Sequence, residues 1–96
     1  MIQIIAVLDV LNITLFKEYE SQALSVMSTY GGHLSSAFKT KESEGDLYRE
    51  VHILSFPNEK QFHSYCNDSA LLRLNSLREQ AISSTQVFIS EKFQEY

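Results

Sequence analysis

The sequence predicts a single α+β domain over residues 1–96, with the element order β-α-β-β-α-β. Three observations support this prediction. Four stretches rich in branched and aromatic residues have the length of strands, two stretches repeat apolar residues at helical spacing, and turn-forming residues separate them. A length of 96 residues suits one domain and is too short for two.

The first predicted strand covers residues 2–10, where Ile, Val and Leu occupy both faces. A strand that is apolar on both faces is typical of the centre of a sheet. Asn12 can then cap a helix by accepting a hydrogen bond from its free N–H groups. This helix has one apolar face, and its opposite face is predicted to be solvent-exposed and to carry Lys, Ser and Glu residues, including Glu20. Gly31-Gly32 predicts its end, because glycine tolerates the positive φ that commonly closes a helix.

A second strand is predicted at residues 33–40 and a third at 47–56, with the polar segment 41–46 as the turn between them. Both faces of the third strand mix apolar and polar residues, so we expect this strand also to be covered on both sides. Pro57 has no N–H to donate and ends it.

The second helical segment begins at Asn58, which provides another capping side chain. Asn67-Asp68-Ser69 repeats the capping signal inside the segment, so we expect a broken helix and not one smooth rod. The apolar spacing continues to about Ala81, and the fourth strand is predicted at residues 83–93.

Two β-α-β crossovers that share one sheet give a ferredoxin-like fold, with a four-stranded antiparallel sheet and two helices on one of its faces. The other face would then expose apolar side chains of the central strands. An apolar surface of that extent is rarely left in water. We therefore expect the same face of a second copy to cover it around a two-fold axis, which makes the protein a homodimer.

The composition argues against several classes of partner. The net charge is −4 and the eight Lys and Arg residues are scattered, which disfavours nucleic acid and anionic membrane surfaces. No apolar run approaches the roughly 20 residues that span a bilayer, and the short apolar N-terminus is interrupted by Asp9. Cys66 is the single cysteine, so folding needs no internal disulfide. We expect a cytoplasmic protein.

A combination of residues extends this prediction to a family. The combination consists of Asn12, Phe16 and Tyr19, then Tyr30-Gly31-Gly32, Glu44-Gly45, Phe56-Pro57, Tyr65, Asn67, Leu71, Leu74, Leu77 and Arg78. Over nearly the whole chain it resembles the domain-of-unknown-function 1330 family of the dimeric α/β-barrel superfamily. The chain has Ser55 where that family usually has an acidic residue.

The resemblance implies the fold and a dimeric α/β barrel, but it implies no reaction. Wider relatives of that superfamily include cofactor-free monooxygenases, muconolactone isomerase-like enzymes and haem-degrading proteins. A shared fold does not fix a function.

Six side chains are candidates for a site. His52 in the third strand is either a general base near neutral pH or a hydrogen-bonded structural histidine. Arg78 and Arg49 are either clamps for a carboxylate or partners in surface salt bridges and helix caps. We expect His52 and Arg78 to be the catalytic pair of an enzymatic site. The predicted ligand-binding side chains are Tyr19, Tyr48, Arg49 and Tyr65.

No metal site or cofactor is predicted. His63 and Cys66 are three residues apart on a helix, but a metal site needs three or four ligands. Gly31-Gly32 follows a helix, whereas phosphate sites favour helix N-termini.

Three functions remain open. The main hypothesis is a homodimer that binds a small organic molecule between sheet and helices. The alternative is a cofactor-free monooxygenase or isomerase that uses His52 as base and Arg49 or Arg78 as the partner of an oxyanion. The third is a structural or regulatory dimerisation module.

Overall fold

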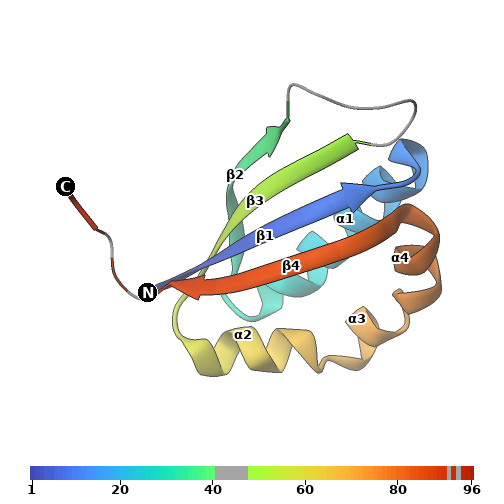
Figure 1. Ribbon diagram of the computed structural model, residues 1–96. Helices are drawn as coiled ribbons and strands as arrows, with labels where there is room; N and C mark the ends of the chain where they lie inside the picture. The colour runs from blue at the N-terminus through green and yellow to red at the C-terminus, as the bar shows by residue number, and fades with distance from the viewer. Residues whose placement is uncertain (41–47, 91, 93) are drawn as a thin grey trace.

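The computed structural model describes residues 1–40, 48–90, 92 and 94–96 (Figure 1). The elements along the chain are β1 (Ile2–Val10), α1 (Ile13–Thr29), β2 (His33–Lys39), β3 (Tyr48–Phe56), α2 (Glu59–Cys66), α3 (Ser69–Leu72), α4 (Asn75–Ala81) and β4 (Ile82–Ser90). The strands form one antiparallel sheet in the order β2-β3-β1-β4, and the helices lie on one face of it (Figure 1). This confirms the ferredoxin-like fold. The predicted turn at 41–46 and the predicted strand positions 47, 91 and 93 lie outside the described residues.

The two ends of α1 form as their capping residues predict. The side chain of Asn12 accepts a hydrogen bond of 3.0 Å from the backbone N–H of Leu15. At the other end Gly31 has a φ of 73°, which disfavours residues with a side chain. A Cβ at Gly32 would lie 2.5 Å from the Phe56 ring, so this glycine allows the helix end to approach β3 closely.

The second helical segment is broken between α2 and α3, as the repeated capping signal predicts, and also between α3 and α4, where Leu74 provides no capping side chain and no break was predicted. The side chain of Asn58 accepts a hydrogen bond from the N–H of Gln61, and that of Asp68 accepts one from the N–H of Ala70. Asp68 also accepts a short hydrogen bond from the Tyr30 hydroxyl. The break between α2 and α3 is thereby tied to the end of α1.

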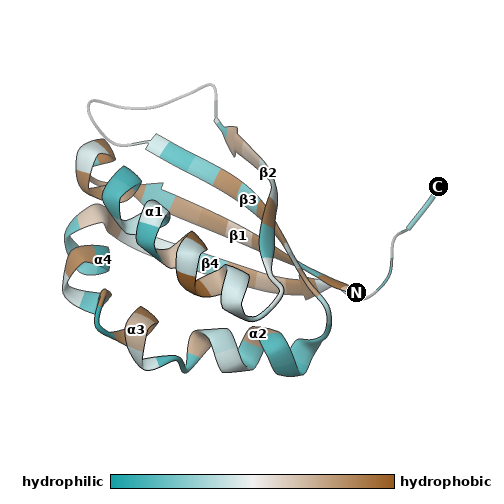
Figure 2. Cartoon of the chain, turned by 180° about the vertical axis from the view of Figure 1, so that it is seen from behind, coloured by the Kyte–Doolittle hydropathy of each residue, from teal (hydrophilic) through white to brown (hydrophobic). Residues whose placement is uncertain are grey.

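The parity of the strands divides the sheet into a helix-covered face and an open face. Residues at even positions of β1 are buried under the helices, and Ala6 pairs with His52 of β3. His52, Leu54 and Phe56 therefore face the helices. Figure 2 shows β1 hydrophobic over most of its length, as a strand with apolar residues on both faces must be. No described helix has the length and apolarity needed to cross a membrane.

The open face of the sheet is apolar and has no helix on it. It carries Ile5, Val7, Val51 and Ile53, which are partly exposed, and Phe38 and Phe88, which are 59% and 55% exposed. The exposed apolar face predicted from the sequence is thus present in the single chain.

Candidate ligand-binding site

A cavity of about 260 Å³ lies between the helix-covered face of the sheet and the four helices. Its wall is mainly apolar and includes Ala6, Ala23, Leu24, Met27, Leu54 and Phe62. Three further wall residues, Leu72, Asn75 and Val87, are exposed, so they mark the mouth of the cavity on the protein surface. Ligand pockets usually measure roughly 300–1,000 Å³, so this one suits a molecule at the small end of that range.

Polar side chains from three helices and two strands reach this apolar cavity. They are Tyr19 and Glu20 of α1, His52 of β3, Tyr65 and Cys66 of α2, Asn75 and Arg78 of α4, and Thr85 of β4. A few converging polar groups in a mainly apolar cavity are typical of small-molecule sites.

His52 lies at the sheet side of the cavity between two carboxylates. Its Nε2 is 2.9 Å from Oε1 of Glu50, and its Nδ1 is 3.6 Å from Oε2 of Glu20. The side chain of His52 is 4% exposed, and the Phe16 ring packs beside it with 5.9 Å between ring centroids. The hydrogen bond with Glu50 fixes the orientation of the imidazole, as a positioned acid or base requires.

Glu20 is the carboxylate of this group that lines the cavity, and its side chain is 21% exposed. Burial raises its pKa above the ordinary value of a glutamate, and the negative charge of Glu50 acts in the same direction. His52 acts in the opposite direction. A carboxylate of raised pKa is a better proton acceptor than an exposed one.

Arg78 is half-buried at the helix side of the cavity. Its Nη2 donates a hydrogen bond of 2.6 Å to Oγ1 of Thr85, and its charge acts on the nearby hydroxyl of Tyr19, lowering the pKa of that group against the larger effect of burial. None of the ion pairs of the described residues includes Arg78. The guanidinium therefore retains donors for an anionic group.

Two buried tyrosine rings complete the polar wall. Burial raises the pKa of both Tyr19 and Tyr65, so their hydroxyls remain hydrogen-bond donors at neutral pH. The charges of Glu20 and Arg78 both act on these two hydroxyls, so each hydroxyl lies within electrostatic reach of both charged side chains.

Cys66 also lines the cavity, and burial raises the pKa of its thiol, which lowers the reactive thiolate fraction. Within the described residues no group of three or more His, Cys, Asp or Glu side chains is arranged to hold a metal ion.

The structure brings four of the six predicted site residues together. His52, Arg78, Tyr19 and Tyr65 all line the cavity. It also decides the parity of β3: the face that carries His52 is the helix-covered one.

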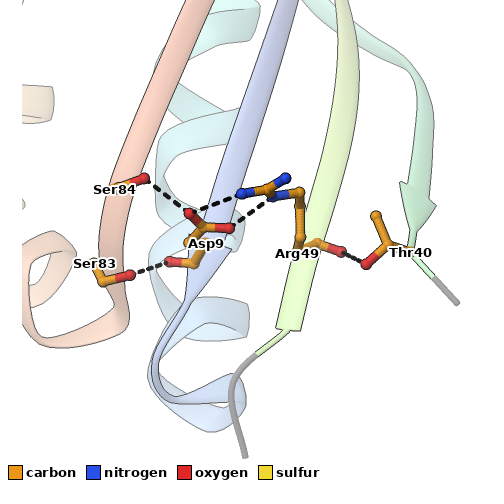
Figure 3. A network of polar contacts seen from close by, with 5 residues as sticks. All are labelled: Asp9, Thr40, Arg49, Ser83 and Ser84. Atoms are coloured by element: carbon orange, nitrogen blue, oxygen red, sulfur yellow. Dashed lines mark hydrogen bonds and ion pairs between the residues drawn. The ribbon is translucent and has the colours of Figure 1, made fainter. Parts of the chain in front are cut away.

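Arg49 and Tyr48 do not line the cavity. Arg49 points to the open face of the sheet, where its Nε donates a hydrogen bond of 2.8 Å to Asp9, which also accepts one from Ser84 (Figure 3). Arg49 is therefore a partner in a surface salt bridge, which was the alternative to its being a clamp for a carboxylate. Tyr48 lies on the helix-covered face with the ammonium of Lys39 4.3 Å from its ring centroid, and its pKa is raised to about 12 by burial and by Glu50.

Glu20 was expected on the solvent-exposed face of its helix, and the structure corrects this expectation. Phe16, Ala23 and Met27 are buried along α1. Position 20 lies four residues after Phe16, three before Ala23 and seven before Met27, so it falls on the same stripe of the helix. A carboxylate in the middle of an apolar stripe is the signal that could have identified it. Thr85 and Asn75 carry no comparable signal, because only the packing of α4 beside β4 brings them to the cavity.

Comparisons with known proteins agree with this fold. The family model described as a domain of unknown function (DUF1330) matches residues 3–93. No curated protein matches the sequence.

Solved structures resemble the chain over almost its whole length. SnoaB, a cofactor-independent oxygenase from Streptomyces nogalater, has a TM-score of 0.69 at 9% identity, covering 98% of this chain and 94% of that one. An uncharacterized NIPSNAP domain protein from Burkholderia xenovorans has a TM-score of 0.72 at 9% identity, covering 97% and 95%. The protein Atu4242 from Agrobacterium tumefaciens has a TM-score of 0.71 at 17% identity, covering 98% and 95%. Identities this low show a shared fold and nothing more.

Proposed function

The chain belongs to the DUF1330 family, a family of unknown function, and from its own structure we propose that it binds a small organic molecule in the cavity between sheet and helices. The observation that carries the proposal is the mainly apolar cavity of about 260 Å³, into which Tyr19, Glu20, His52, Tyr65 and Arg78 converge. An apolar wall supplies binding energy, and a few polar groups fix the orientation of the bound molecule.

Binding can be tested by NMR titration of the ¹⁵N-labelled protein with three small aromatic probes: indole, benzyl alcohol and benzoate. We expect at least one probe to shift the amide signals of residues that line the cavity. Ala23→Leu adds volume to the buried wall and should abolish the shifts. Ala37→Leu adds the same volume at an exposed position of β2 and should leave them unchanged. If no probe binds, or if both variants bind equally, the cavity is not the site and a dimerisation module becomes the better interpretation.

We propose further that two copies pair through the open face of the sheet. Phe38 and Phe88 are more than half exposed there, and Ile5, Val7 and Val51 between them make the centre of the face apolar. Apolar patches of this kind mark protein contacts, and a face that covers itself around a two-fold axis needs no second partner.

Sedimentation equilibrium tests the pairing. The wild-type chain should sediment as a dimer at micromolar concentration, and Phe88→Asp should shift it toward the monomer because it buries a charge in the interface. Ile13→Asp places the same charge on an exposed apolar residue at the start of α1 and should not affect the dimer. A wild-type monomer at high micromolar concentration would exclude the pairing.

A second candidate function is a cofactor-free enzyme with His52 as base. The favouring observation is that the imidazole is held between Glu20 and Glu50 at the wall of a cavity that also contains Arg78. α-Angelica lactone is a small probe for this activity, because its isomerisation needs only a proton taken from one carbon and returned to another. Turnover should be lost in His52→Ala and retained in His33→Ala, whose histidine is exposed. Equal rates in both variants would exclude His52 as the base.

A further inference from the structure

We infer that the cavity selects a small organic acid with one negative charge and a separate hydroxyl group, the acid lying against Arg78 and the hydroxyl against Glu20. This inference rests on the proposed binding function and adds the chemical class of the ligand. It also assigns Glu20 as the residue that determines specificity.

The acid-binding pole is built around Arg78. Arg78 is half-buried, its Nη2 donates to the neutral hydroxyl of Thr85, and the neutral hydroxyl of Tyr19 lies within reach of its charge. No carboxylate of the described residues pairs with it. A half-buried guanidinium has five N–H donors in a planar fork that matches a carboxylate, and desolvation strengthens such a pair. The missing counter-charge is therefore supplied by the ligand.

The Tyr65 hydroxyl adds a donor near this pole. Tyr65 is 8% exposed and lines the cavity, and within the described part of the chain its hydroxyl makes no hydrogen bond. No fully buried side-chain nitrogen or oxygen of the described residues lacks a partner, so this hydroxyl keeps some accessible surface, and the side chain that carries it lines the cavity. A molecule that covers this donor when it binds should accept a hydrogen bond from it, because a buried donor without a partner costs free energy.

A second pole of the cavity, formed by Glu20, His52 and Glu50, is negative. Glu20 lines the cavity, and Glu50 lies behind it across the imidazole of His52. When both carboxylates are ionised, they give this group a net negative charge whether or not the imidazole is protonated. This pole attracts a hydrogen-bond donor such as a hydroxyl and repels a second carboxylate.

Five ligands of similar size separate these contributions in NMR titrations of the full chain: benzoate, 3-hydroxybenzoate, 4-hydroxybenzoate, terephthalate and benzyl alcohol. We expect the better hydroxybenzoate isomer to bind about fivefold or more tightly than benzoate, since it adds one hydrogen bond to a charged group. Terephthalate places its second carboxylate toward Glu20 and should bind about tenfold more weakly than hydroxybenzoate.

Three variants assign the poles. Arg78→Met keeps the aliphatic length and should weaken binding of the acids about 10- to 100-fold while leaving benzyl alcohol unchanged. Arg73→Met removes an exposed arginine between α3 and α4 and should change neither. Glu20→Gln should reduce the difference between terephthalate and hydroxybenzoate to less than about threefold, because it removes the repelling charge.

The outcomes distinguish this inference from the proposed function. If benzyl alcohol binds as tightly as the acids, and Arg78→Met has no effect on either, the cavity binds small molecules but the assigned ligand class is wrong. If terephthalate binds as tightly as hydroxybenzoate to the wild-type chain, the assignment of Glu20 is wrong. If none of the ligands shifts the cavity signals, the proposed binding function itself fails.

Discussion

Replacing His52 with leucine tests whether the imidazole holds two buried carboxylates in place. Leucine fills a similar volume, so the loss from packing should be small. The substitution removes a hydrogen bond of 2.9 Å to Glu50 and the 3.6 Å contact with Glu20. The side chains of these glutamates are only 16% and 21% exposed, so water replaces the imidazole poorly.

The magnitude follows from these contacts. One hydrogen bond to a charged group contributes about 1.5–3 kcal/mol, and a buried carboxylate left without a partner adds a further cost. We expect His52→Leu to lower the free energy of unfolding by about 3 kcal/mol at pH 7. With an m-value of about 1.5 kcal/mol/M in urea, the midpoint should fall by about 2 M.

The assay is urea unfolding followed by circular dichroism at one fixed protein concentration, because self-association would contribute to stability. His63→Leu is the matched control: His63 lies 3.3 Å from Glu59 on the surface, and its removal should change stability by less than about 0.5 kcal/mol. Adding Glu20→Gln to His52→Leu should recover part of the loss. The reasoning is refuted if His52→Leu is as stable as the wild type, or if the loss is unaffected by Glu20→Gln.

Three further predictions use the same framework. Burial raises the pKa of Glu20 above its ordinary 4.5, so the unfolded chain loses this proton at a lower pH than the folded chain does. The stability of the wild type should therefore fall relative to that of Glu20→Gln as the pH rises from about 4.5 through the raised pKa. If the stabilities of the two proteins, measured by unfolding between about pH 4 and 8, stay parallel, this prediction is wrong. Gly32→Ala should cost about 1–3 kcal/mol in thermal or urea unfolding, because its Cβ would lie 2.5 Å from the Phe56 ring; an unchanged midpoint would show that the ring moves away freely. Cys66 should react several-fold more slowly with Ellman's reagent at pH 8 than free cysteine does, and a saturating cavity ligand should slow it further; a rate equal to that of free cysteine would show an exposed thiol.

The order of the elements and their ends follow from local signals. Asn12 and Asn58 begin helices because their side chains accept the first free N–H groups, and Gly31 ends α1 because it adopts a positive φ. The break at Asp68 is local for the same reason. These signals act within a few residues, so the sequence alone is enough to predict them.

Part of the cavity lining could have been predicted from the spacing of residues in the sequence. Positions 49 and 52 differ by an odd number, so Arg49 and His52 must face opposite sides of the strand and cannot share a cavity. Glu20 lies on the buried stripe of α1 by its spacing from Phe16 and Ala23. The periodicity of β3 and α1 was therefore sufficient to place Arg49 away from His52 and to place Glu20 on the buried stripe. The prediction for Glu20 was wrong because it followed the polarity of the side chain.

The sequence by itself determined the α+β fold, the capped and broken helices and the apolar open face of the sheet, because these depend on periodicity and on short-range hydrogen bonding. The tertiary structure decided which face of β3 points to the helices, that Arg78 and Thr85 meet beside Tyr19, and that His52 lies between Glu20 and Glu50. The decisive contacts join residues that are far apart in the chain: the rest of α1 and all of β2 separate Glu20 from His52, and Tyr19 is likewise remote in sequence from Arg78. Their geometry is set by how α1 and α4 pack on the sheet, and local spacing carries no information about that packing.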